Sequence, residues 1–272
     1  MSFEPLNGSH AIAEVVFGLM LRRPFNRSEI EALANSHDRW RDMLPRLSRQ
    51  STVQFLMGAG GQLPPPEMLP TGAGGVLFDR VKPDGELAWR LSAQEQSLNV
   101  NCLEYSRWAE IWPQVRAFLK DASEVAAIST NPVTNVVLQY VDLFEWRDRS
   151  KSVRVNQLLD PDNPDLPSTA GQHGELWHVH QGWFRKENLP VPGQILERIH
   201  IDGVLSQAKM LPTVKIDIYL RLDLESPIKT SDLFKGNADT LFSYLHDTHK
   251  SILAKFLTKA AAERIGLKNA ST

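Results

Sequence analysis

The stretch from Thr213 to Glu225, TVKIDIYLRLDLE, decides the fold class of this chain. Aliphatic residues occupy every second position from Val214 to Leu224, and charged residues with one tyrosine fill the positions between them. Successive side chains of a β-strand point to opposite faces, whereas a helix would spread these aliphatic residues around its circumference. The pattern therefore predicts one long strand with an apolar face and a charged face.

Other segments of the 272-residue chain carry similar patterns. Apolar runs of strand length predict further strands at residues 10–21, 52–57, 76–81, 86–91, 97–103, 133–146, 175–186 and 194–205. Apolar residues at helical spacing predict helices near residues 26–47, 105–119 and 237–265. We expect Asn26 and Glu29 to cap the first of these helices and Pro45 to close or kink it. Residues 133–146 are apolar on both faces, which is typical of a central strand.

These elements predict an α+β fold with a large antiparallel sheet and long amphipathic helices packed mainly on one face. Residues 1–150 form a first α+β half, and residues 151–272 form a second half of three strands and a helix. Because both halves run from strands into a long helix, the order suggests an internal duplication. The polar segment 147–170 either links two domains or is an excursion from one continuous domain.

Residues 58–75, GAGGQLPPPEMLPTGAGG, hold six glycines and four prolines. A phosphate-binding loop needs a glycine run that leads into a helix, but here the glycines lead into prolines and no GxxxxGK[ST] motif occurs. We therefore expect a mobile surface loop without essential contacts.

The composition excludes several classes of protein. The net charge is −2, and neither half has the basic excess of a nucleic-acid binder, so nucleic acid is not an expected partner. Cys102 is the single cysteine, which rules out an internal disulfide. No apolar run approaches the roughly 18 residues of a membrane span, and no secretion signal opens the chain. The expectation is a cytoplasmic protein with no membrane partner and no cofactor.

The polar faces of the strands in the second half carry the candidate site residues, which are His178, His180, His200, Asp202, Tyr219 and Arg221. Neighbouring strands lie about 4.8 Å apart, so imidazoles from adjacent strands can converge. Three histidines and a carboxylate would suit zinc or another divalent metal, while a solvent-wetted or partner-covered face explains the same pattern without one. His246 and His249, three residues apart on the last helix, are expected on a partly exposed helix edge.

Four stretches resemble a known family: PLNGSHAIAEVVFGL (5–19), YSRWAEIW (105–112), LQYVDLF (138–144) and LHDTHKSILAKF (245–256). The chain is similar to a sporadically distributed bacterial family of functionally uncharacterised proteins of about this length. Members typically have Asn where this chain has Asp142. The shared motifs are mostly aliphatic and aromatic, which implies a role in the fold, and the resemblance implies no catalytic residue. The patchy occurrence of the family suggests a link to mobile-element or defence genes.

Two hypotheses about function follow. The first is a non-enzymatic binding or assembly protein that engages a protein partner or a second copy of itself as a homodimer. The second is a metal-dependent enzyme, a hydrolase, centred on the histidines of the second half. No GxSxG, HExxH or paired CxxC motif is present, which favours the first.

Overall fold

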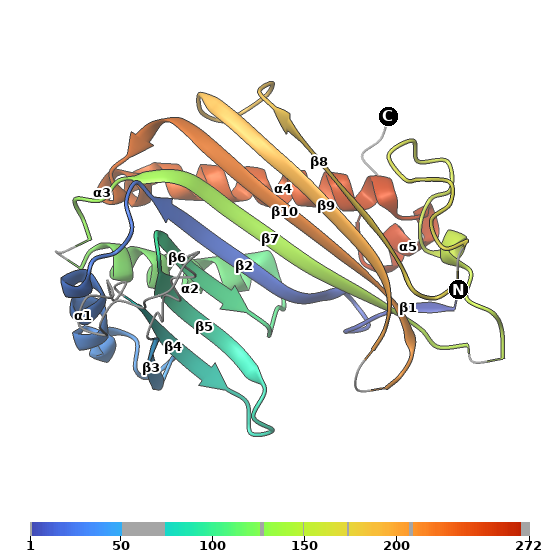
Figure 1. Ribbon diagram of the computed structural model, residues 1–272, viewed down its shortest axis with the longest axis horizontal. Coiled ribbons are helices and arrows are strands. Elements are labelled where there is room, and N and C mark those ends of the chain that lie inside the picture. Colours follow the sequence, from blue (N-terminus) through green and yellow to red (C-terminus); the bar gives the residue numbers. More distant parts are fainter. Residues whose placement is uncertain are drawn as a thin grey trace, which may run out of the picture.

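The computed structural model describes residues 2–50, 74–125, 128–148, 150–172, 174–206 and 209–267. It has an α+β fold built on a large, twisted antiparallel sheet of ten strands (Figure 1). The expected strand at 52–57 and nearly all of the expected loop at 58–75 lie outside the described residues.

The strands are β1 (Phe3–Pro5), β2 (Ile12–Leu21), β3 (Arg46–Gln50), β4 (Gly75–Val81), β5 (Leu87–Gln94), β6 (Ser97–Cys102), β7 (Val133–Trp146), β8 (Trp177–Arg185), β9 (Gly193–Leu205) and β10 (Pro212–Ile228). Their order across the sheet is β3-β4-β5-β6-β2-β7-β10-β9-β8, and β1 pairs with the end of β7. The pair β7 and β10 therefore joins the first half of the chain to the second.

The prediction for residues 213–225 is confirmed. β10 pairs with β7 on one side and with β9 on the other. Val214, Ile216 and Leu220 are at most 2% exposed, because this face lies under helices, whereas the alternate residues are half-buried on the other face. β7 is central, as expected, but its second face is only partly covered.

The longer helices are α1 (Arg27–Asn35), α2 (Trp108–Ser123), α4 (Ala238–Phe256) and α5 (Lys259–Arg264). Short helical turns complete the set: η1 (His37–Arg39), η3 (Val155–Gln157), α3 (Thr230–Asp232) and η4 (Leu233–Asn237). α2 and α4 lie on the same side of the sheet, behind it in Figure 1. α4 packs against β7 and β10, and α2 packs against β6. No helix in the described ranges is long and apolar enough to cross a membrane.

Two helices are shorter than the sequence pattern predicts. The helix expected at 26–47 ends at Asn35, and β3 begins directly after Pro45, which cannot continue a helix. The helix expected at 237–265 breaks at Leu257, where the backbone is extended and pairs with Leu159. The side chain of Thr258 then caps α5. The segment before β8 therefore decides where the last helix ends.

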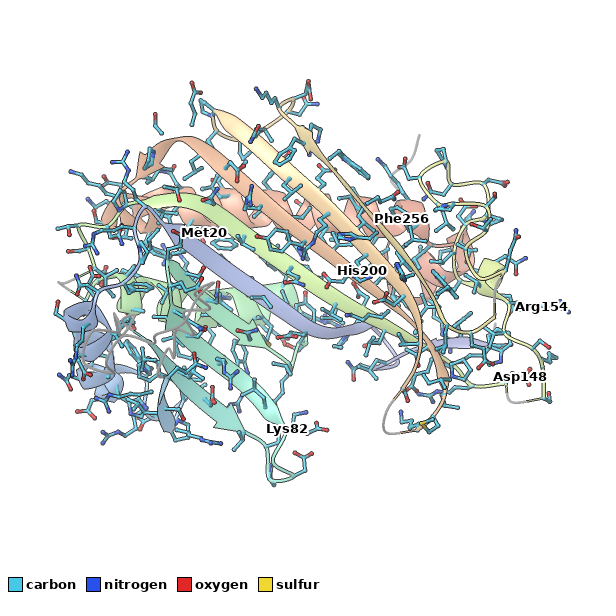
Figure 2. The ribbon with its side chains drawn as sticks, in the orientation of Figure 1. Met20, Lys82, Asp148, Arg154, His200 and Phe256 are labelled. Carbon is cyan, nitrogen blue, oxygen red and sulfur yellow. The ribbon has the colours of Figure 1, made fainter. Side chains whose placement is uncertain are left out.

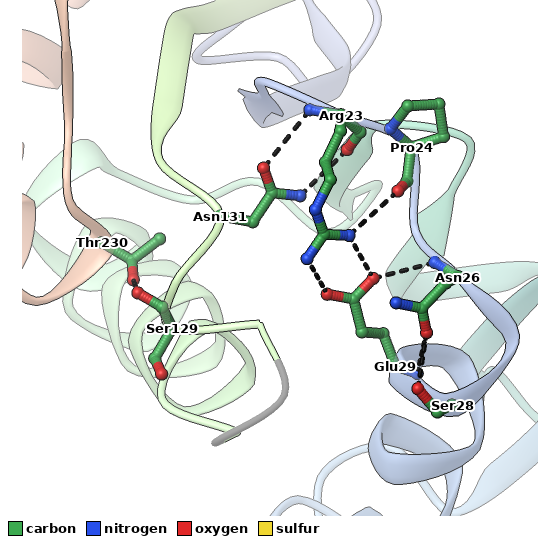
Figure 3. Close-up of polar contacts among 8 residues, drawn as sticks. All are labelled: Arg23, Pro24, Asn26, Ser28, Glu29, Ser129, Asn131 and Thr230. Carbon is green, nitrogen blue, oxygen red and sulfur yellow. Dashed lines mark hydrogen bonds and ion pairs between the residues drawn. The ribbon is translucent and has the colours of Figure 1, made fainter.

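The start of α1 confirms the predicted capping pair (Figure 3). The side chain of Asn26 accepts a hydrogen bond from the Glu29 backbone, and the Glu29 carboxylate accepts one from the Asn26 backbone. Glu29 is 1% exposed and forms two hydrogen bonds with the guanidinium of Arg23. The amide of Asn131 bonds the backbone of Arg23, so this cluster fastens α1 to the turn before β7.

Two units of similar strand order meet at the central pair, β2 and β7, when β7 is counted with the strands that follow it rather than with residues 1–150. In the first, β2 is followed by the meander β4-β5-β6 and then α2, with β6 beside β2. In the second, β7 is followed by the meander β8-β9-β10 and then α4, with β10 beside β7. A single hydrophobic cluster contains buried residues from both halves. The duplication itself stays a prediction.

Candidate functional site

The structure brings four of the six predicted site residues together on the open face of the sheet. His178 pairs with Asp202 across β8 and β9, and His180 pairs with His200. The rings of His180 and His200 stack with centroids 5.1 Å apart, and His200 Nε2 lies 2.8 Å from Asp202 Oδ1. Figure 2 shows His200 on the sheet face turned away from α4.

The remaining two predicted residues lie elsewhere on this face. The guanidinium of Arg198 sits 4.4 Å from the ring centroid of Tyr219. Arg221 forms an ion pair of 2.6 Å with Asp223 on its own strand. In the part of the chain that the structure describes, no three His, Cys, Asp or Glu side chains are placed to hold a metal ion.

A cavity of about 430 Å³ lies on the opposite, helix-covered face. Its described lining comes from the segment before β2, the start of α2, the strand β7, the helix α4 and the turn after α5: Ser9, His10, Ala11, Ile12, Tyr105, Ser106, Arg107, Trp108, Tyr140, Asp142, His246, His249, Lys250, Leu253, Ile265, Gly266 and Leu267. The four stretches quoted above for the family resemblance each supply residues to this lining. Each stretch contributes at least one polar residue to the cavity.

The regular repeat of side-chain direction along a strand and along a helix explains why these polar residues face the cavity. Tyr140 and Asp142 are two apart on β7, so they share the face that α4 covers. His246 and His249 are three apart on α4, so they share one side of the helix. His10 belongs to the excursion between β1 and β2, which both pair with β7.

Asp142 and His249 form a buried pair at the base of the cavity. Asp142 Oδ2 lies 3.3 Å from His249 Nε2, and the two residues are 1% and 3% exposed. The ring of Tyr140 stacks on that of His249 with centroids 3.9 Å apart. Because Nε2 faces the Asp142 carboxylate, the other ring nitrogen of His249, Nδ1, is left for a further contact. This Nδ1 is buried and has no hydrogen-bond partner among the described residues.

His246 is a neutral imidazole in the wall of the cavity. Its Nδ1 lies 2.9 Å from the Tyr140 hydroxyl, and its ring stacks on Trp108 with centroids 4.3 Å apart. Burial, together with the charges of the neighbouring His249 and Lys250, lowers the pKa of His246 to about 3. Burial also raises the pKa of Tyr140 well above its usual range. The un-ionised phenol of Tyr140 therefore shares a hydrogen bond with His246 Nδ1.

His10 and Tyr105 form the side of the cavity nearest the excursion before β2. Their rings meet edge-on with centroids 5.6 Å apart. Burial lowers the pKa of His10, against the opposing effect of the Asp142 carboxylate, and burial raises the pKa of Tyr105 to about 12. His10 Nδ1 is a second buried nitrogen for which the described residues offer no partner.

Sequence reasoning missed this site. The expectation that His246 and His249 lie on a partly exposed helix edge is wrong for His249, which is 3% exposed beneath the segment before β2 and the turn after α5. One signal was available: His249 falls between Leu245 and Leu253 on the apolar stripe of the helix, where a polar residue needs a partner. Asp142, a carboxylate within a strand apolar on both faces, is the matching signal.

Comparison of the chain with models of protein families and with curated proteins finds no match.

Proposed function

We propose that the chain is a non-enzymatic binding protein and that the cavity between α2, α4 and β7 is its site for a small organic molecule. One observation carries the proposal: His249 Nδ1 is buried, unpartnered among the described residues, and lines a cavity large enough for a ligand. Binding pockets commonly measure about 300–1,000 Å³ and combine apolar walls with a few placed polar groups.

The buried polar groups of Asp142 and His249 lower the stability of the folded chain. A buried polar group without a hydrogen bond costs about 1–3 kcal/mol, and a buried carboxylate costs more unless it is paired. A sequence selected for stability alone would have apolar residues at positions 142 and 249. This chain has them at neighbouring positions of β7 and α4. A ligand that completes these hydrogen bonds offsets the cost.

Thermal denaturation in the presence of a small-molecule library tests the proposal. A ligand at roughly 100 times its Kd stabilises the folded state by about 2.7 kcal/mol, which raises Tm measurably. We expect the stabilisation to disappear in His249→Phe, which removes the unpartnered nitrogen but keeps an aromatic ring at this position. The matched control, His200→Phe on the open face, should respond like the parent chain. Compounds that stabilise His249→Phe equally would contradict the proposal.

A second candidate function is assembly with a protein partner or a second copy. β8 is the last strand on its side of the sheet as described, so one of its edges is free for pairing. Phe184 on this strand is 57% exposed, and Leu176 just before it is 65% exposed. We infer a homodimer that uses this edge or the open face beside it, and light scattering of the purified protein would measure it.

The alternative of a metal-dependent hydrolase rests on His178, His180, His200 and Asp202. The strand register that places these four side chains on one face of β8 and β9 supports it, whereas no three such groups in the described ranges are placed to hold a metal ion. Elemental analysis of purified protein tests this alternative: a stoichiometric metal that is lost in His200→Ala would favour it.

Three further proposals concern the origin of the fold, the genomic context and the location of the protein. The shared strand order of the two halves supports an ancient duplication of one strands-then-helix unit. A link to mobile-element or defence genes rests on the family resemblance alone. A cytoplasmic location rests on the sequence.

A further inference from the structure

The strand β8 ends the sheet on one side and lacks the sequence features that commonly prevent further pairing. It is the last strand in the order of the sheet as described (Figure 1), and it pairs with β9 along its whole length without a register shift. No proline and no Asp, Glu, Lys or Arg occurs from Trp177 to Phe184. Edge strands that stay unpaired commonly carry charges, prolines or bulges, as β3 does with Arg46 and Arg49. The free edge of β8 is therefore open to a further strand.

Two large apolar residues lie exposed at the two ends of this strand. Leu176 directly precedes β8 and is 65% exposed, and Phe184, near its end, is 57% exposed. Alternation along a strand places both on the open face of the sheet, with His178 and His180. Leu176 and Phe184 stand at equal distances along the chain from His180, one before it and one after it. The exposed apolar surface is therefore symmetric about His180.

The residues on either side follow the same symmetry. Glu175 and Arg185 also stand at equal distances from His180, and so do Trp177 and Trp183. Glu175 is exposed, so its carboxylate is available to a partner, and the two tryptophans are half-buried on the helix-covered face. The stretch from Glu175 to Arg185 is therefore self-complementary. Set against its own reverse, it opposes an acid to a base, a leucine to a phenylalanine and a tryptophan to a tryptophan.

We propose that two copies of the chain pair through β8 as antiparallel strands about a twofold axis at His180. A twofold axis perpendicular to the sheet brings the same edge of both copies together and makes the two strands antiparallel. With the axis at His180, Glu175 faces the partner's Arg185 and Leu176 faces the partner's Phe184. This inference rests on the second candidate function, the homodimer, because it assigns the contact surface and the register of that dimer.

Three physical effects stabilise this contact. The main-chain N–H and C=O groups at the free edge of β8 exchange water for hydrogen bonds to the second strand. The two contacts between Leu176 and Phe184, which the axis relates, remove exposed apolar surface from water. The two pairs of Glu175 with Arg185 add charge complementarity at the rim, where it favours the correct register over others.

The neighbouring registers lose these contacts. An axis that passes between two residues would oppose side chains from different faces of the sheet, so the axis lies at a residue. An axis at Gln181 opposes Glu175 to the partner's Glu187, and like charges directly opposite each other are destabilising. An axis at Val179 opposes Leu176 to a glycine of the partner, which has no side chain to cover it. His180 is therefore the centre that the sequence favours.

Single cysteine substitutions measure the register, because the native Cys102 is buried. Residues directly opposite each other have Cα atoms about 4.5–5.5 Å apart, which a disulfide can span. We expect His180→Cys to form a disulfide between two copies under mild oxidation, as measured on non-reducing gels. Val179→Cys and Gln181→Cys are the matched controls and should not. Each of these residues is displaced along the strand from its own copy, which separates the two Cα atoms by ~8 Å.

A charge swap tests the pairing of the exposed apolar residues. Leu176→Glu and Phe184→Lys should each raise the dimer Kd about tenfold or more, because an unpaired charge then faces an apolar side chain. The double variant should recover most of this loss, since the introduced carboxylate of one copy faces the introduced ammonium of the other. Within one copy the two positions are roughly 27 Å apart, so a monomer cannot produce the recovery. Sedimentation over a concentration series measures the Kd, with Val81→Lys as the control for an added surface charge.

The outcomes separate this inference from the homodimer itself. If a dimer forms but crosslinks only in Val179→Cys or Gln181→Cys, or in none of the three variants, the axis at His180 is wrong and the homodimer uses another contact. A double variant that dimerises no more tightly than the single variants would overturn the pairing of Leu176 with Phe184. A monomeric parent chain would overturn the homodimer and this inference together, while the cavity keeps its own test in the library screen.

Discussion

The carboxylate of Asp142 lies 3.3 Å from His249 Nε2, although the two residues are 107 positions apart in the chain. One residue comes from the central strand β7, and the other comes from α4, which packs against that strand. Both are almost fully buried. Both residues line the cavity, so this contact connects the stability of the fold to its candidate site.

A double-mutant cycle should show that the two residues are coupled. Removing either partner from a buried pair leaves the other without its compensating contact. We therefore expect Asp142→Ala and His249→Ala each to destabilise the chain, and the double variant to cost less than the sum by about 1–3 kcal/mol. Urea denaturation monitored by circular dichroism measures the three free energies. Strict additivity would mean that the pair contributes no mutual stabilisation.

Acidification should destabilise the protein through His246. Its pKa is about 3 in the folded chain, against 6.5 as the ordinary value, so between these values the unfolded chain binds the proton more readily. Stability from this group is therefore fully present above about pH 6.5 and decreases as the pH falls toward 3. Unfolding at pH 7.5 and pH 5 should show a smaller loss of Tm for His246→Gln than for the parent chain. His178→Gln, on the exposed face of β8, serves as the control and should follow the parent.

The two faces of β10 should respond differently to substitution. Leu220 is 0% exposed, so Leu220→Asp buries a carboxylate without a partner and should cost about 4 kcal/mol or more. Tyr219 lies on the open face, and Tyr219→Ser removes mainly its contact with Arg198, which should cost about 1 kcal/mol. Thermal denaturation of both variants measures the difference. Similar values of Tm would contradict the register of the strand.

Self-association should depend on the exposed edge of the sheet. If two copies meet at β8, a charge at Phe184 is placed in the contact, so Phe184→Lys should shift the mass measured by light scattering toward a monomer. Val81→Lys, a comparable change at a residue 42% exposed on β4, should leave the mass unchanged. A parent chain that is monomeric at tens of micromolar would rule out the homodimer.

Local sequence pattern was sufficient to predict most of the strands and the apolar side of the long helices. The alternation in residues 213–225 predicted β10 because side-chain direction in a strand depends only on position along it. The capping pair Asn26–Glu29 was predictable for the same reason, since it spans three residues. Helix ends were less predictable: Leu257 leaves the helix because its backbone pairs with Leu159, a contact between distant segments.

Local sequence patterns were enough to predict the α+β class, the antiparallel strands and the polar row that contains His178, His180, His200 and Asp202, because each depends on residues close together along the chain. Which polar residues share a cavity depended on how distant segments pack. Asp142 and His249 become partners because β7 lies at the centre of the sheet and α4 crosses its covered face. Such a contact between distant segments depends on packing, and no spacing within either segment encodes it.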